Sequence, residues 1–273
     1  MQTQPYQTLP CVAPPERPGL NGIACDVVAR VAAARGGAVR DGSDSLCEPT
    51  ITALVAAAVT GERVRCRAVL ADARRAQICD SRFVDAYLPA AARRMGADWT
   101  ADRMSFAQVS IGTAQLQGLL RDIPAGRGET TAHGDSTPVP GQGTAIMVVP
   151  AGEQHSFGAR IAASRLRRSG VAVDLMFAPS PARLLAALRG RGVDALMFSA
   201  GGAEGLAICR DLIHLVRCDH SDALPTIVGG ASLEGGQDVA ASTGADIVTS
   251  DPGAALRACM ARIPIAHVAR GSA

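Results

Sequence analysis

Ala145-Ile146-Met147-Val148-Val149-Pro150-Ala151-Gly152-Glu153-Gln154-His155-Ser156-Phe157-Gly158 is the stretch that decides the fold. Its first five residues are apolar and end at a Pro-Ala-Gly turn, and an amphipathic segment, Phe157–Arg168, follows. A short apolar run bounded by turn residues predicts a buried strand, and apolar residues at three- and four-residue steps predict a helix. The stretch therefore predicts a strand, a loop and a helix.

The same alternation continues toward the C-terminus. Parallel strands need crossover connections, and helices between successive strands supply them. The sequence therefore predicts an α/β fold with a doubly wound, five-stranded parallel sheet. The other predicted strands are Val171–Phe177, Ala195–Ser199, Thr226–Val228 and Asp246–Thr249, and the other predicted helices are Pro181–Arg189, Glu204–Val216, Gln237–Thr243 and Pro252–Arg262.

The chain upstream of this pattern has a different character. Apolar residues recur at helical spacing through Pro49–Ile123, which predicts an N-terminal helical bundle. A stretch rich in Gly, Pro, Ser and Thr follows the bundle, and the first 48 residues carry many Pro and Gly. The predicted organisation is a mobile N-terminal arm (1–48), a helical-bundle cap domain (49–123), a linker (124–143) and the doubly wound domain (144–273).

Composition excludes several classes of function. The formal net charge of +2 is too small to predict a nucleic-acid surface from bulk electrostatics. The eight cysteines contain no Cys-x-x-Cys pair, so they predict neither a zinc nor a redox site. No secretory signal and no apolar run of bilayer length is visible, and we therefore expect a cytoplasmic protein without membrane contact.

The loop after the first strand carries the candidate metal ligand. Ligands of doubly wound sheets bind beyond the carboxyl ends of the strands, and His155 lies there, two residues after Glu153. A neutral imidazole binds a metal through one ring nitrogen, and a carboxylate bonded to the other raises its basicity. The loop lacks Gly-x-Gly-x-x-Gly and Gly-Lys-Ser/Thr, so it predicts no phosphate cradle.

Two further loops of the same rim are rich in glycine. The third strand leads into Ser199-Ala200-Gly201-Gly202, and the fourth leads into Gly229-Gly230. Paired glycines let a bulky ligand lie directly on backbone that a Cβ would block. The rim thus predicts an imidazole, a hydroxyl and a floor without side chains.

These residues resemble the cobalamin-binding domain of methionine synthase, the mutases and corrinoid carrier proteins. Its pattern, Asp-x-His-x-x-Gly, then Ser-x-Leu, then Gly-Gly, appears here as Glu153-x-His155-x-x-Gly158, Ser199-x-Gly201 and Gly229-Gly230. The resemblance implies a flavodoxin-like domain that binds adenosyl-, methyl- or hydroxocobalamin base-off, with His155 on cobalt. Glu153 replaces Asp and Gly201 replaces Leu, so the contact to His155 and one wall of the tail slot differ from the family pattern.

A second resemblance covers the bundle as well. Gly96-Ala97-Asp98-Trp99, the run from Asp102 to Gly112 and Leu116-Gln117-Gly118-Leu119-Leu120 look like the AerR/PpaA family of purple-bacterial antirepressors. The resemblance implies a cobalamin-binding, light-responsive transcriptional regulator that is not an enzyme and contacts an aerobic repressor of the CrtJ/PpsR type, with DNA reached through that repressor. The cofactor-binding residues it implies, together with the loop positions beside them, are Trp99, Glu153, Gln154, His155, Ser156, Phe157, Gly158, Ser199, Ala200, Gly201, Gly229, Gly230 and Ser250.

Other interpretations stay open. In light-sensing relatives nine residues separate the corrin-facing Trp from a Glu-His pair, whereas Val109-Ser110 stands at that place after Trp99. A corrinoid carrier or methyltransferase subunit would use the same domain, and a doubly wound signalling domain without cofactor would share the fold.

Asp102 and Ser105 are interpreted as helix caps. Arg160, Arg165, Arg167 and Arg168 are interpreted as a solvated helix face, with contact to an acidic repressor patch as the alternative.

Overall fold

The computed structural model describes residues 46–124, 143–153, 156–190, 192–219, 224–230 and 236–251. The predicted arm up to residue 45, the linker from 125 to 142 and the last predicted helix, Pro252–Arg262, lie outside these ranges. The division into domains therefore stays a prediction at those boundaries.

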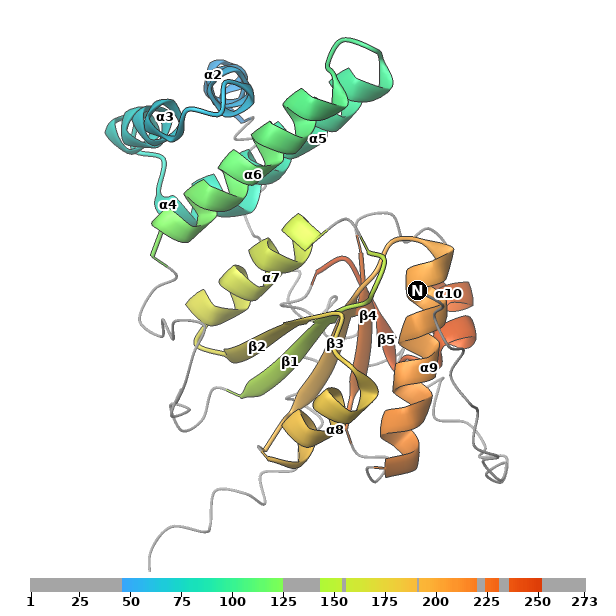
Figure 1. Ribbon diagram of the computed structural model, residues 1–273. Coiled ribbons are helices and arrows are strands. Elements are labelled where there is room, and N and C mark those ends of the chain that lie inside the picture. Colours follow the sequence, from blue (N-terminus) through green and yellow to red (C-terminus); the bar gives the residue numbers. More distant parts are fainter. Residues whose placement is uncertain are drawn as a thin grey trace, which may run out of the picture. The chain divides into compact units, whose positions relative to one another are not determined.

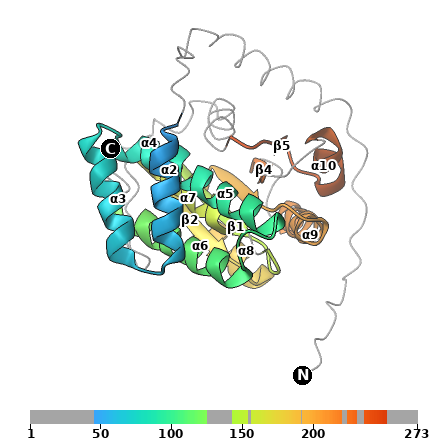
Figure 2. The ribbon, with the colours of Figure 1, turned by 90° about the horizontal axis from the view of Figure 1, so that it is seen from above.

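The first described part of the chain is entirely helical, as predicted. Buried Leu54, Phe83, Leu88, Met95 and Leu116 lie in one apolar cluster that the helices share. In both views the long helices α5 and α6 lie side by side (Figures 1 and 2). The elements are α2 (Glu48–Val59), α3 (Arg63–Arg75), α4 (Asp80–Arg82), the π-helix η1 (Phe83–Tyr87), α5 (Leu88–Thr100) and α6 (Phe106–Asp122).

The structure refines the prediction at the starts of two helices of the bundle. Helical structure runs unbroken from Asp80 to Thr100 through η1, within the stretch that was predicted to be helical. Ser105 caps α6 in a full capping box with Gln108, which confirms its predicted role. Asp102 does not cap this helix: it lies in the preceding turn with a φ of 55°.

The second part is the predicted parallel sheet, in the order β2-β1-β3-β4-β5. All five strands are found, and the β5 ladder is shorter than predicted. The elements are β1 (Thr144–Val149), α7 (Ser156–Arg168), β2 (Ala172–Phe177), α8 (Pro181–Arg189), β3 (Ala195–Ser199), α9 (Ala203–Asp219), β4 (Thr226–Gly229), α10 (Gly236–Thr243) and β5 (Ile247–Val248).

Helices cover both faces of the sheet (Figure 1). Alternate residues of β1 divide between two cores: Met147 packs with Ala163 and Leu166 of α7, and Val148 packs with residues of α8, α9 and α10. A sheet covered on both faces needs strands that are apolar throughout, which explains the unbroken apolar runs in the sequence.

The topology fixes where a ligand can enter. Strand β1 lies between β2 and β3; α7, which connects β1 to β2, covers one face of the sheet, and α8, which connects β2 to β3, covers the other. The order of winding reverses at β1 and β3, and the crevice beyond their carboxyl ends is the ligand site of such sheets. The predicted loops lie at this edge.

Candidate functional site

The loop after β1 makes a tight turn at the carboxyl edge. The Glu153 N–H donates to the Pro150 carbonyl over 3.3 Å, and Gly152 has a φ of 78°, a conformation that glycine adopts without strain. Helix α7 begins at Ser156, and Phe157 is buried. Gln154 and His155 lie outside the described residues, so the predicted cobalt ligand stays a prediction.

Glu153 joins this loop to the loop after β3. Its Oε2 accepts a hydrogen bond from the Gly201 N–H over 2.8 Å. The predicted contact between Glu153 and His155 is not tested, whereas the bond to Gly201 was not foreseen. Burial and then the charge of Glu153 raise the pKa of the nearby Cys209 thiol to about 12, so this thiol is neutral at physiological pH.

The ends of β3 and β4 are locked together. Ser199 is opposite Gly229 in the ladder, and the Ala200 N–H donates to the Gly229 carbonyl over 2.9 Å. A Cβ on Gly229 would lie 3.0 Å from the Thr249 carbonyl oxygen of the strand beyond. The chain itself therefore requires glycine at position 229, because backbone of the β5 end occupies the space.

No described neighbouring atom explains why the other positions of the rim are glycines. A Cβ on Gly158 or Gly202 would meet no described atom within 4 Å, and one on Gly201 would meet only Glu153, at 3.9 Å. Gly158 is in helix α7, where glycine costs about 1 kcal/mol relative to alanine. The open space above these glycines fits a bulky ligand lying on bare backbone, and the rim passes this test for a corrinoid.

Comparisons with known proteins identify the domain that contains the sheet. Residues 143–259 match the B12 binding domain family. An uncharacterised 20.5 kDa protein from the bchF-crtJ intergenic region of Rhodobacter capsulatus is 36% identical over 165 residues, which are 60% of this chain and 83% of that protein. This chain belongs to the family of that protein. It carries a B12-binding domain at its C-terminal side.

One solved structure agrees with this fold. The monomethylamine corrinoid protein of Methanosarcina barkeri is 17% identical, with a TM-score of 0.58 over 79% of this chain and 97% of that one. A cobalamin-binding protein of Desulfitobacterium hafniense DCB-2 is 13% identical, with a TM-score of 0.41 over 78% and 98%. The first of these supports the fold of the B12-binding domain.

Two predicted site residues lie away from the three loops. Trp99 is near the end of α5, 48% exposed, and its ring is tilted against that of Phe106 with centroids 6.3 Å apart. Ser250 is exposed after β5. Their predicted contact with a corrinoid stays a prediction. The other predicted residues lie at the carboxyl edge of the sheet, as expected: Ser199 and Gly229 end β3 and β4, Ala200, Gly201 and Gly230 follow these strands, and Ser156 begins α7.

Not all arginines of α7 lie on the predicted solvated face. Arg165 lies 3.5 Å from Asp251, Arg167 donates to the Val173 carbonyl over 2.7 Å, and Arg168 pairs with Asp85 of the bundle. The sequence of α7 does not reveal these partners, because the carboxylates and the carbonyl belong to other elements. The solvated-face interpretation was wrong for Arg167 and Arg168, whereas the side chain of Arg165 is 48% exposed and agrees with it.

Arg160 is the fourth of these arginines and has a different environment. Its guanidinium carbon lies 4.5 Å from the centroid of the Phe177 ring, and its Nε is buried without a hydrogen-bond partner in the described chain. Desolvation, and then the nearby charge of Arg121, lower the pKa of Arg160. The side chain is therefore held by stacking, and its helical spacing gave no signal of this.

The described residues contain no conventional metal centre. Among them, no three His, Cys, Asp or Glu side chains gather closely enough to hold an ion. The described cysteines at positions 47, 66, 79 and 209 are free thiols. None of the described helices has the length and apolar character of a bilayer span.

Proposed function

We propose that this protein binds cobalamin at the carboxyl edge of its sheet, with His155 as the axial ligand of cobalt, and uses the cofactor as a sensor in transcriptional control. The observation that carries the proposal is the coincidence of the B12-binding domain match with the unobstructed glycines at the start of α7 (Gly158) and after β3 (Gly201 and Gly202). No catalytic role is proposed for the chain.

The described residues would divide the binding between them. Gly158 and Gly202 leave room for the macrocycle, because no described atom lies within 4 Å of a Cβ at either position. Ser199 would offer its hydroxyl to the nucleotide tail beside the Gly229 backbone. A bound corrin absorbs visible light, and its upper cobalt–carbon bond breaks on excitation.

The regulatory part rests on the relative and on the bundle. The Rhodobacter capsulatus protein comes from the bchF-crtJ intergenic region. We propose a shared role as an antirepressor of photosystem genes, exerted on an aerobic repressor of the CrtJ/PpsR type, with Trp99 facing the upper side of the corrin. The bundle would then be a two-position element whose equilibrium the cofactor biases.

Reconstitution tests the cofactor. Purified protein is mixed with hydroxocobalamin or with adenosylcobalamin, desalted, and its visible spectrum is recorded; the adenosylcobalamin sample, which has a cobalt–carbon bond, is recorded again after illumination. We expect about one corrin per chain, and we expect His155→Ala to lose it or to shift its spectrum, because another group would replace the imidazole. His214→Ala, on the exposed side of α9, is the matched control and should bind normally. If the protein stays colourless, the remaining interpretation is a doubly wound signalling domain that binds no cofactor.

A pull-down tests the output. The purified repressor, with and without its DNA, is mixed with loaded protein that was kept dark or illuminated. We expect retention to depend on the state of the cofactor. Equal retention under all conditions would contradict the antirepressor role.

A corrinoid carrier for a methyltransferase is the alternative function. The fold similarity to the Methanosarcina barkeri corrinoid protein favours it. Transfer of a labelled methyl group between the loaded protein and a methyltransferase would support this alternative over the sensor.

A further inference from the structure

Helix α7 packs against the sheet and the bundle at once. One face carries Ala159, Ala163 and Leu166, which lie in the apolar cluster of the sheet. The other face carries Phe157 and Ile161, which pack into the apolar cluster of the bundle. Spacings of three, four and seven residues place each set on one side of a helix.

Arg168 extends the bundle-facing side of α7. It follows Ile161 by seven residues, pairs with Asp85 and donates to Ser164 Oγ over 2.9 Å. The side chain of Arg168 is 16% exposed and that of Asp85 is 32% exposed, so water screens this pair less than the fully exposed pairs of the surface. Loss of one partner would leave the other charge partly buried and without its counter-charge.

Asp85 belongs to an unusual segment. It lies in η1, the π-helical turn between α4 and α5, with Phe83, Val84 and Tyr87 buried on the bundle side. Helix α7 contacts η1 and α6 directly. π-Helical turns are rare, occur mostly as single turns inside α-helices and are frequently found at functional sites.

We propose that α7 couples the cofactor loop to the helical bundle, with Phe157 at its start and the Arg168–Asp85 pair at its end as the two points of attachment. The inference rests on the proposed function, since α7 begins at Ser156, directly after the predicted cobalt ligand. Displacement of His155 shifts α7, and the shift reaches the bundle at η1. Asp85 and Arg168 are positioning residues in this device and do not touch the cofactor.

The first test uses the protein without cofactor. Amide hydrogen exchange is measured in Asp85→Asn, Arg168→Gln and the double variant. We expect each single change to raise exchange in both η1 and α7 by about tenfold, since a charge-assisted contact is lost, and the double change to add little more. Asp80→Asn, which removes the Arg74 partner within the bundle, is the control and should leave α7 unchanged. Additive effects, or an effect confined to one element, would overturn the proposal.

The second test uses protein loaded with adenosylcobalamin, whose cobalt–carbon bond is broken by light. The chain has one tryptophan, so its fluorescence reports on α5 alone. Illumination is expected to change the Trp99 emission in the wild type, and Asp85→Asn is expected to lose at least half of that change while the visible spectrum stays normal. A full-sized change in Asp85→Asn would refute the coupling. If the wild type does not bind cobalamin, the proposed function is refuted. The result of the hydrogen-exchange test would still hold, because that test uses the protein without cofactor.

Discussion

Single glycines separate the requirements of folding from those of ligand binding. Gly229→Ala places a Cβ 3.0 Å from the Thr249 carbonyl oxygen, which belongs to backbone that cannot yield easily. We expect this change to lower the free energy of unfolding by about 1–3 kcal/mol. Gly158→Ala meets no described atom and gains helix propensity, so it should raise stability by up to about 1 kcal/mol.

The same two variants should rank differently in cobalamin binding. If the corrin lies on α7, Gly158→Ala weakens binding although the protein is more stable. Urea unfolding without cofactor and titration with hydroxocobalamin measure the two quantities separately. Unchanged affinity in Gly158→Ala would show that the ligand does not approach this glycine.

Asp122 gives a pH-dependent prediction at the same scale. Its carboxylate accepts from Arg63 Nε over 3.1 Å and from Arg67 Nε over 2.8 Å, and these two hydrogen bonds hold the pKa of Asp122 well below its usual range. A carboxyl whose pKa is depressed by folding stabilises above its unfolded pKa of about 3.9, and the contribution is lost as the pH falls toward the folded value. Asp122→Asn should therefore cost about 1 kcal/mol at pH 7 and progressively less below pH ~4.

Urea unfolding at several pH values checks this prediction. Asp72→Asn, which removes an exposed i,i+3 partner of Arg75, is the comparison and should cost little at any pH. An Asp122→Asn penalty that does not change between pH 7 and acid would mean that the ion pairs contribute nothing.

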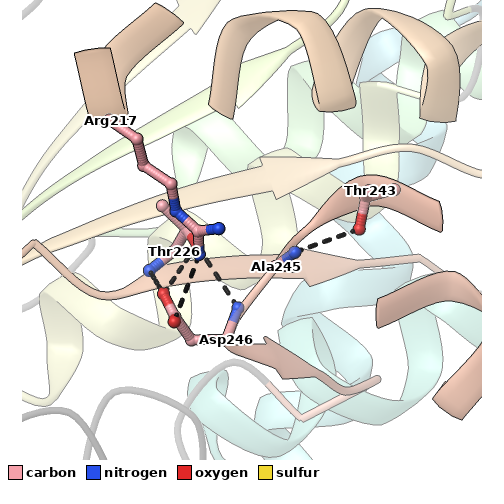
Figure 3. Close-up of polar contacts among 5 residues, drawn as sticks. All are labelled: Arg217, Thr226, Thr243, Ala245 and Asp246. Carbon is pink, nitrogen blue, oxygen red and sulfur yellow. Dashed lines mark hydrogen bonds and ion pairs between the residues drawn. The ribbon is translucent and has the colours of Figure 1, made fainter. Parts of the chain in front are cut away.

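At the scale of elements, two aspartates fix the strand starts away from the site. Asp246, directly before β5, accepts from the Thr226 N–H and from Thr226 Oγ1, each over 2.7 Å, and Arg217 Nη2 donates to its other oxygen over 3.2 Å (Figure 3). Asp194, directly before β3, accepts from the Thr144 N–H over 2.7 Å in the same way. The Asp246 contacts hold β5 in register with β4, because the ladder between them is only two residues long.

Removing this anchor should loosen β5 first. Thr226 is fully buried, so Asp246→Ala leaves its N–H and hydroxyl short of acceptors, at a cost of about 1–3 kcal/mol. Hydrogen exchange should rise most at the Thr249 N–H, which donates to the Val228 carbonyl, and least in β1. A uniform rise through the sheet would show that the anchor acts on global stability only.

The elements also show what the sequence could and could not predict. Apolar runs and helical spacing predicted all five strands and the helices α7 to α10, because each pattern is local. The Arg168–Asp85 pair joins residues 83 positions apart, and the Glu153–Gly201 bond spans 48, so no local pattern contains them. The π-helical turn was missed for another reason: Phe83 to Tyr87 has ordinary helical spacing, and packing selects the wider ladder.

At the scale of the whole molecule, the shared helix predicts cooperative unfolding. Phe157 and Ile161 of α7 complete the bundle's apolar cluster, while Ala159 and Leu166 complete that of the sheet. Neither cluster can open fully without disturbing α7. Urea unfolding followed by Trp99 fluorescence, which reports on the bundle, and by far-ultraviolet circular dichroism should therefore give coincident transitions.

Combining Phe157→Ala with Asp85→Asn removes two of the attachments of α7 to the bundle and leaves, of the described apolar contacts, only that of Ile161. We expect the Trp99 transition to move to lower urea than the dichroism transition, because a lost aromatic contact and a lost ion pair weaken the bundle side alone. Ala163→Gly is the comparison, since it weakens the sheet-facing side of the same helix. Transitions that stay coincident in the double variant would mean that the bundle and the sheet unfold together through contacts other than those of Phe157 and Asp85.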